Sequence, residues 1–298
     1  MWCSSKPLQR FAPTLNLKSP PPIPPDFMNL AISSPTSTPV GRRSIPRLLA
    51  PLEHLAKNSK HLLRNTTDSF LVQGESYALP RYIFRGPGTN IEPLRLAIFA
   101  GIHGDEPETA LGLIQFLEEL DRHPALAEGY EIFTYPLCNP TGYEDQTRAS
   151  RRGFDLNREF WKNSNEVEIH ILEQELQSLP FHGIVSLHSD DTSNGMYGFV
   201  RGPDISEELL KPALHIADKI LPRNPGAIID GFEADQGIIR QGYTNILSAP
   251  ADIRPRPFEI VLETPAQAPV YLQVAAFRAA LQTILDEYRA LISIAPGL

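Results

Sequence analysis

The sequence predicts an α/β fold: a single domain with a mixed, mostly parallel twisted sheet and helices on both faces, preceded by a Pro-rich irregular leader. Two observations predict it. Short apolar runs typical of buried strands alternate along the chain with segments whose apolar residues recur at helical spacing. The length of 298 residues also suits a single large α/β domain.

Residues 1–44 form the predicted leader, and the domain is expected over 45–298. Eleven of the 29 prolines fall within the first 51 residues, in runs such as LKSPPPIPPDF. Proline at this density excludes a helix or a central strand, so an extended or disordered segment is expected. The alternatives are a Pro-rich ligand for an SH3-like partner, a true start at Met28 and a transit peptide.

The elements of the predicted domain follow one another in a regular order. A helix is expected first, over 46–64. Strands are then expected at 69–73, 81–86, 94–101, 130–137, 183–188, 196–202 and 258–263, and further helices at 107–122, 166–179, 205–220 and 269–291. Pro107 favours a helix start, because proline is well tolerated at the first helical position. Residues 139–165 are predicted to form a polar loop.

The net charge of −8 is unevenly distributed. Residues 1–51 hold six Lys or Arg and one acidic residue, which leaves the predicted domain strongly acidic. An acidic domain without a basic stripe argues against nucleic acid as a partner. No run of about 18 apolar residues is present, so neither a transmembrane helix nor a membrane partner is expected. Cys3 and Cys138 make no disulfide framework, and a cytoplasmic location is the default expectation.

Ionisable residues stand at the ends of three apolar strands. His103 and Glu106 follow the first, His188 ends the second and Glu263 ends the third. Ligands bind at the carboxyl ends of strands in open α/β sheets, and an unpaired buried charge is unfavourable. Two imidazoles and a carboxylate, with a fourth position left for water, are a familiar zinc ligand set in hydrolases. The pattern therefore predicts that His103, Glu106 and His188 bind zinc and that Glu263 transfers the proton of a water.

The predicted loop between these strands is rich in arginine. It contains Arg148, Arg151, Arg152 and Arg158, with Asn157 beside the last of them. Guanidinium groups bind carboxylates through two parallel hydrogen bonds, so the loop indicates an anionic ligand. For Arg151 and Arg152, ion pairs with surface acids are an equal alternative.

Five segments, in this order, resemble the motifs of the zinc carboxypeptidases and of their shorter relatives, the murein-peptide amidases and the succinylglutamate desuccinylase/aspartoacylase group. GIHGDEPE resembles the first metal motif, NPTG the Asn-Pro-x-Gly turn and FDLNREF the Asn-Arg substrate motif. SLHS resembles the segment of the third zinc ligand and VLET the strand of the catalytic glutamate. The resemblance covers residues 94–264 and implies a zinc-dependent metallocarboxypeptidase or amidohydrolase with one zinc ion.

The resemblance also implies roles for the matching residues. Glu263 would act as general base and then as general acid, and Arg148 would stabilise the charge that develops on the carbonyl oxygen. Asn157 and Arg158 would hold the terminal carboxylate of the substrate. Tyr243 lies at about the interval of the family's mobile substrate tyrosine, but its neighbours do not match, so ordinary packing is the alternative.

Two departures from the family leave the substrate open. The interval from Glu106 to His188 is short, as in the bacterial amidase-like members, which argues against large peptides. The segment HSDDTSNGMYGF resembles the aspartoacylases. The expected function is hydrolysis of a peptide or amide beside a residue with a free carboxylate; N-acyl amino acid deacylation is the alternative, and a non-catalytic binding domain a lesser one. The expected partner is a small peptide or an acyl-amino acid.

The remaining polar residues receive less specific expectations. Asp190 and Asp191 are expected to form a polar turn or to orient a histidine. The choice between peptide hydrolysis and deacylation depends on the substrate pocket, for which four residues are candidates: Arg240, Asp252, Arg254 and Arg256. The other histidines are expected at the surface or in packing contacts: His54, His61, His123, His170, His182 and His215.

Overall fold

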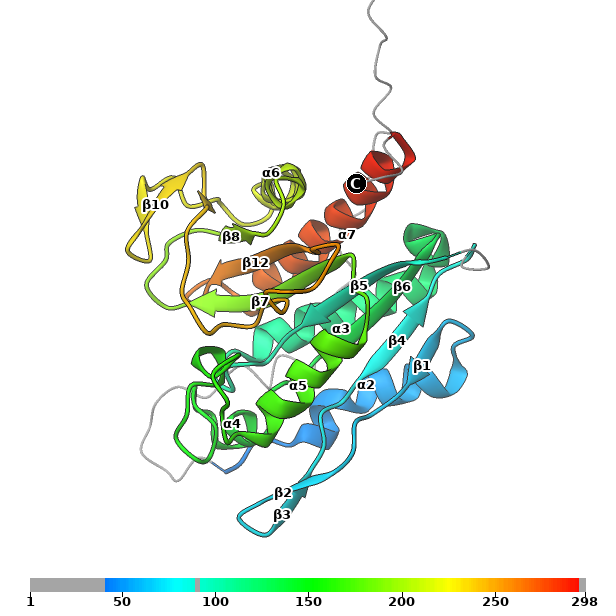
Figure 1. Cartoon of the computed structure of the whole chain (residues 1–298), viewed down its shortest axis with the longest axis vertical. Coiled ribbons are helices and arrows are strands. Elements are labelled where there is room, and N and C mark those ends of the chain that lie inside the picture. Colours follow the sequence, from blue (N-terminus) through cyan, green and yellow to red (C-terminus); the bar gives the residue numbers. More distant parts are fainter. Residues whose placement is uncertain (1–40, 89–91, 295–298) are drawn as a thin grey trace, which may run out of the picture. The chain divides into compact units, whose positions relative to one another are not determined.

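The structure, a computed structural model, describes residues 41–88 and 92–294, which lie within one compact unit that begins at Ser37. All but the last four residues of the predicted leader, and the alternative start at Met28, lie outside the described residues. The described chain forms a ten-stranded mixed sheet with helices packed against it (Figure 1). A short separate hairpin consists of β2 (Phe70–Val72) and β3 (Glu75–Tyr77).

Four adjacent parallel strands form the centre of the sheet. Their order is β6 (Tyr130–Tyr135), β5 (Leu94–Phe99), β7 (Gly183–Asp190) and β12 (Phe258–Pro265). These strands are largely buried, as expected where helices cover both faces. Beyond β6 lie β4 (Tyr82–Arg85) and β1 (Leu62–Arg64), and beyond β12 lie β8 (Tyr197–Arg201), β11 (Ile238–Ile239), β10 (Phe232–Asp235) and β9 (Ile228–Ile229).

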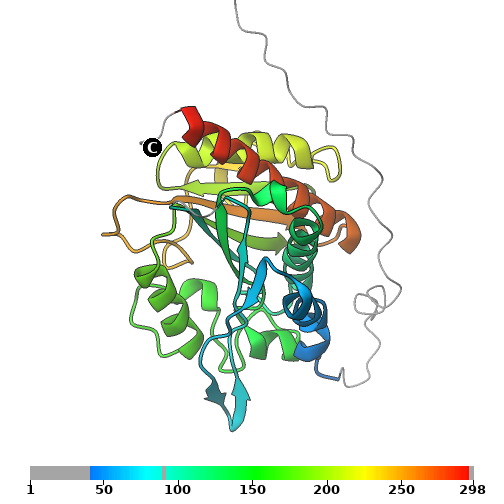
Figure 2. The ribbon, with the colours of Figure 1, turned by 90° about the vertical axis from the view of Figure 1, so that its right-hand side faces the viewer.

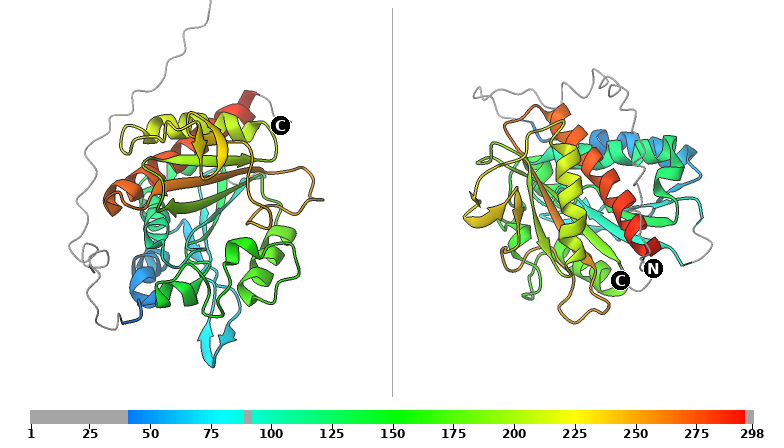
Figure 3. Two further views of the ribbon diagram at one scale, coloured as in Figure 1. Left: turned by 90° about the vertical axis from the view of Figure 1, so that its left-hand side faces the viewer. Right: turned by 90° about the horizontal axis from the view of Figure 1, so that it is seen from above.

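Helices cover both faces of the sheet, which confirms the predicted fold class. On one face α2 (Ile45–Asn58), α3 (Pro107–Arg122), α7 (Val270–Ile294) and α6 (Ile205–Ala217) pack side by side in this order. On the other face α5 (Val167–Ser178) buries its apolar residues against Phe99 and Ile184. Figures 2 and 3 show the sheet between these two layers.

The predicted first helix is too long at its end. The helix α2 stops at Asn58, and Leu62–Arg64 form the edge strand β1, which pairs with β4. The Ser59 hydroxyl accepts hydrogen bonds from the backbone amides of His61 and Leu62, which turns the chain away from the helix axis. The apolar pair Leu62–Leu63 fits either periodicity, so sequence alone did not distinguish the two.

The predicted polar loop 139–165 contains two short elements, α4 (Pro140–Asp145) and the 3₁₀ turn η2 (Leu156–Arg158), and a second 3₁₀ turn, η1 (Pro124–Ala127), precedes β6. The strands β3, β9, β10 and β11 were also not predicted. They are two to four residues long, which is too short to show a periodic pattern. None of the described helices has the length and apolar character needed to cross a membrane.

Candidate active site

The first two predicted metal ligands lie on the turn that joins β5 to α3. His103 and Glu106 are both buried there, at 3% and 5% exposure, and Pro107 begins the helix behind them. The turn is packed directly against α4, because a Cβ atom on Gly104 would lie 1.9 Å from the backbone carbon of Gly142. Only glycine allows the two segments to approach this closely.

The NPTG segment supports this turn from the side. The Asn139 side chain accepts a hydrogen bond from the Gly142 amide and so caps α4. Its amide nitrogen lies 3.3 Å from the carbonyl oxygens of Ile102 and Arg148, to which it donates. One buried side chain thus links the metal-binding turn to the arginine-rich loop.

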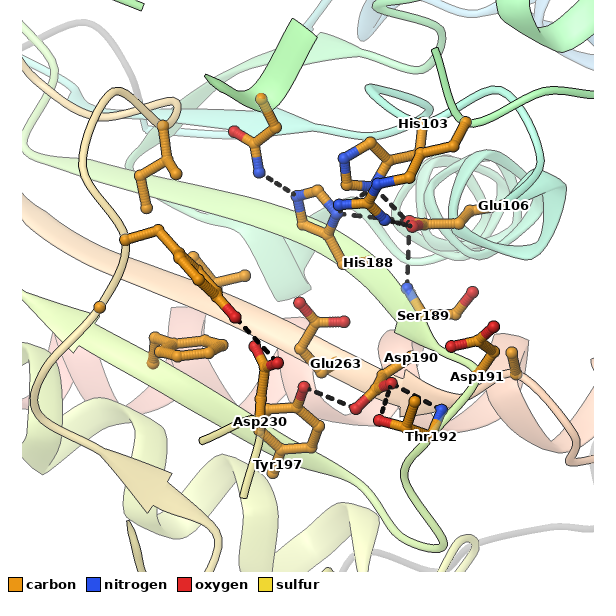
Figure 4. Close-up of a pocket in the computed structure, with 18 of the residues that line it drawn as sticks. His103, Glu106, His188, Ser189, Asp190, Asp191, Thr192, Tyr197, Asp230 and Glu263 are labelled. Atoms are coloured by element: carbon orange, nitrogen blue, oxygen red, sulfur yellow. Dashed lines mark hydrogen bonds and ion pairs between the residues drawn. The ribbon is translucent and has the colours of Figure 1, made fainter. Parts of the chain in front are cut away.

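The other two predicted residues come from neighbouring strands. In the register of β7 with β12, His188 lies directly opposite Glu263, so both side chains project from the same face at the carboxyl end of the sheet. Figure 4 shows His103, Glu106, His188 and Glu263 around one pocket. Residues that are far apart in the sequence therefore meet, as the strand order requires.

Three of these side chains form a buried group that could hold a metal ion. One ligand atom from each of His103, Glu106 and His188 lies within 4.8 Å of the others. The two histidine Nδ1 atoms face each other at 3.2 Å, and the Glu106 carboxylate lies 2.6 Å from Nδ1 of His103 and 3.3 Å from Nδ1 of His188. Two imidazole nitrogens and one carboxylate, converging in this way, are a donor set that suits zinc.

The outer nitrogens of the two rings have their own partners. Nε2 of His103 lies 3.2 Å from the Asp155 carboxylate, and Nε2 of His188 lies 3.0 Å from the Ser186 hydroxyl. Such contacts hold a ring so that its other nitrogen is free to bind a metal. The sequence analysis did not single out Asp155, although it stands in the FDLNREF segment.

The electrostatics of the group also suit a cation. Burial alone would raise the pKa of the Glu106 carboxyl, but the adjacent His103 and His188 rings lower it to about 2. Burial lowers the pKa of His188. Burial also acts to lower the pKa of His103, but the Glu106 and Asp155 carboxylates outweigh it and raise that pKa. The site thus combines an ionised carboxylate with two imidazoles.

Glu263 lies beside the group without belonging to it. Burial raises the pKa of its carboxyl well above the usual range, and nearby carboxylates, Glu106 first, raise it further. A cation held by the three ligands would oppose that repulsion. The position of Glu263 suits a group that takes and returns a proton.

The predicted substrate residues line the same pocket, which has a volume of about 570 Å³. Nε of Arg148 lies 3.1 Å from the Asp155 carboxylate, and its Nη1 lies 3.6 Å from Oε1 of Glu106. The side-chain oxygen Oδ1 of Asn157 accepts a hydrogen bond from the backbone amide of Leu247. This contact fixes the Asn157 side chain with its amide nitrogen toward His188. Arg158 completes the set on the pocket wall.

Tyr243 also lines the pocket, so it is not a packing residue of the interior. Cζ of Arg158 stands 4.1 Å from the centroid of the Tyr243 ring, in a cation–π contact. The Tyr243 hydroxyl donates a hydrogen bond of 2.9 Å to Asp230. Sequence reasoning missed Asp230 and several further lining residues, among them Asp105, Tyr197, Phe199 and Arg201.

Several candidates lie elsewhere. Arg151 forms ion pairs with Glu144 and Asp145, as the alternative predicted. Arg152 also forms an ion pair, but its partner Glu166 is buried and is not a surface acid. The four candidates for the pocket feature that separates the two functions do not line the pocket: Arg240, Asp252, Arg254 and Arg256. The six remaining histidines are exposed or half-buried and do not line the pocket either.

Asp190 and Asp191 lie on the rim of the pocket. The Asp190 carboxylate accepts hydrogen bonds from the backbone and the hydroxyl of Thr192 and from the Tyr197 hydroxyl. It therefore forms the polar turn that was expected.

Comparison with known proteins finds one matching family model and similar solved structures. Residues 93–238 match the model of the succinylglutamate desuccinylase/aspartoacylase catalytic domain, whereas no curated protein matches the chain. A protein from Shewanella denitrificans OS217 that is named a metallopeptidase is 25% identical, with a TM-score of 0.66 over 81% of this chain and 89% of its own.

A metallo-carboxypeptidase from Burkholderia cenocepacia shares the fold at 16% identity, with a TM-score of 0.63 over 84% of this chain and 70% of its own. The chain thus has the carboxypeptidase-like fold of the succinylglutamate desuccinylase/aspartoacylase group.

Proposed function

We propose that the protein is a zinc-dependent hydrolase that cleaves a peptide or amide bond next to a residue with a free carboxylate. The proposal rests on one observation: the buried group of His103, Glu106 and His188 lines a pocket. The same pocket is also lined by the predicted catalytic and substrate residues Glu263, Arg148, Asn157 and Arg158. Nitrogen and carboxylate ligands with an open position are the donor set of catalytic zinc.

A zinc ion held by these three residues would polarise the carbonyl of the scissile bond and acidify the attacking water. The Glu263 carboxylate takes the proton of that water and then delivers it to the nitrogen of the leaving amine. The Arg148 guanidinium donates hydrogen bonds to the carbonyl oxygen as negative charge develops there. Glu263 is thus first a base and then an acid.

Asn157 and Arg158 give the site its requirement for a free carboxylate. A guanidinium and a neighbouring amide provide donors for both oxygens of a terminal carboxylate, which places the scissile carbonyl at a fixed distance from the metal group. Among residues 41–88 and 92–294, Arg158 forms no ion pair with an acidic side chain, so its charge is available to a ligand.

Substrates with a blocked C-terminus test this requirement. We expect the zinc-loaded protein to hydrolyse an N-acylated dipeptide and to lose about 10²-fold or more in kcat/KM when the terminal carboxylate is replaced by an amide, because a charge-assisted pair is lost. Hydrolysis rates of the paired substrates measure the effect. Equal rates for the two substrates would show that Asn157 and Arg158 do not bind the carboxylate.

The second candidate function is deacylation of N-acyl amino acids. The match of residues 93–238 to the desuccinylase/aspartoacylase domain favours it, and it uses the same metal group and the same carboxylate site. Succinyl- and acetyl-amino acids, assayed beside acylated dipeptides and γ-glutamyl peptides, separate the two functions. Turnover confined to the acyl-amino acids would select the deacylase.

A further inference from the structure

Asp230 stands at the tip of a tight turn on the wall of the pocket. The turn joins β9 to β10, and its two central residues, Asp230 and Gly231, have φ values of 51° and 80°. Two residues with positive φ between paired strands are typical of a type I′ hairpin, in which Asn, Asp and Gly are all well tolerated. Figure 4 shows the Asp230 carboxylate close to Glu263 and Tyr197.

The charge of Asp230 is not required by the turn. Asn in its place would form the same hairpin without bringing a negative charge close to Glu263. No ion pair to Asp230 exists among residues 41–88 and 92–294, and its one side-chain hydrogen bond comes from the neutral Tyr243 hydroxyl. Arg158 and Arg148 act on its charge without forming an ion pair and favour the ionised carboxylate. The residue itself is exposed, so a ligand in the pocket can reach its carboxylate.

Arg158, Tyr243 and Asp230 form a continuous row along the pocket wall. The guanidinium lies over the face of the Tyr243 ring, and the carboxylate accepts from the hydroxyl at the far end of the same side chain. The row therefore presents a positive group and a negative group that are separated by one tyrosine. A molecule with a carboxylate and a nearby cation matches it.

Arg201, the other arginine on this side of the pocket, is already engaged. Its guanidinium lies 3.3 Å from the carbonyl oxygen of Tyr243, to which it donates, and it also interacts with the buried carboxylate of Glu259. An acidic side chain on the leaving residue would be repelled by the carboxylates of Asp230 and Glu263. Since Arg201 is engaged elsewhere, the carboxylates of Asp230 and Glu263 favour a cationic side chain on this wall of the pocket.

We propose that Asp230 determines specificity by binding an ammonium or guanidinium group on the leaving amino acid. Substrates would carry a C-terminal residue with a basic side chain, its carboxylate on Asn157 and Arg158 and its cation on Asp230. This inference rests on the proposed function. The protein would then prefer substrates with a basic leaving residue over those with an apolar or acidic one.

The test compares two substrates of similar size, benzoylglycyl-lysine and benzoylglycyl-norleucine, with the zinc-loaded protein. The wild type is expected to prefer lysine, and Asp230→Asn to lower kcat/KM for lysine by about 10- to 100-fold while leaving norleucine unchanged. Asp230→Gly, which also suits the turn, should give the same loss. Asp235→Asn on β10, an exposed carboxylate outside the pocket, is the matched control and should change neither rate.

The outcomes separate this inference from the function on which it rests. The inference is overturned if the wild type cleaves both substrates equally well, or if Asp230→Asn slows both alike, because Asp230 then does not bind the cation of the substrate. The proposed hydrolase function would still stand. If wild type cleaves no peptide or amide at all, the proposed function itself fails. Retained lysine preference in both Asp230 variants would also overturn the inference.

Discussion

Replacement of Glu263 by Gln is expected to lower kcat by about 10²- to 10⁴-fold, the usual contribution of a positioned general base. The amide of Gln has almost the same shape as the carboxylate but cannot accept the proton of the attacking water. Glu263 does not belong to the buried group of His103, Glu106 and His188, so bound zinc should be unchanged. Steady-state kinetics together with metal analysis of both proteins measure the two quantities.

Glu233→Gln provides the matched control, because Glu233 is exposed on β10 and does not line the pocket. Its turnover and zinc content should equal those of the wild type. Undiminished turnover in Glu263→Gln would exclude Glu263 as the proton acceptor. Zinc binding without turnover in the wild type, over a broad panel of amides, would favour a non-catalytic binding domain.

Replacement of Arg148 by Gln is expected to lower kcat by about 10²- to 10³-fold, equivalent to about 3–4 kcal/mol of transition-state stabilisation. In the proposed mechanism the guanidinium stabilises the charge that develops on the carbonyl oxygen, so its loss should affect kcat more than KM. Arg148 also pairs with Asp155, which contacts Nε2 of His103. Zinc content must therefore be measured beside the kinetics.

Arg240→Gln is the control for this experiment. Arg240 pairs with Glu207 at the surface, outside the pocket, and surface ion pairs contribute at most about 1 kcal/mol to stability. The control should retain full turnover. An unchanged kcat in Arg148→Gln would remove Arg148 from the stabilisation of the carbonyl oxygen, and a parallel loss of zinc would assign it to the support of the metal site instead.

The central part of the site could be predicted because its residues follow long apolar strands. His103, His188 and Glu263 each stand at the end of a strand that is buried on both faces, and parallel strands bring their carboxyl ends to one edge of the sheet. The register that sets His188 opposite Glu263 then follows from strand pairing. Periodicity and topology were sufficient for this part.

The part of the substrate pocket around Asp230 could not be predicted in the same way. Asp230 is carried by strands of two and four residues, which have no readable period, and its one local signal, the Asp-Gly pair, predicts a turn without indicating where the turn lies. Arg254 and Arg256, two of the four candidate pocket residues, do not line the pocket. In the structure Arg256 pairs with Glu259 and Arg254 donates to its own neighbouring backbone. Their positions depend on loop packing, which sequence spacing does not encode.

The most direct test of the account is the zinc content of the purified, dialysed full-length protein, measured by mass spectrometry for the wild type and for His188→Ala. The account predicts about one zinc ion per chain in the wild type and a large loss in the variant, because a three-ligand site does not survive removal of an imidazole. His182→Ala, which changes a half-buried histidine outside the pocket, should keep its zinc. A wild type that binds no zinc, or a His188→Ala variant that binds as much as the wild type, would contradict the account.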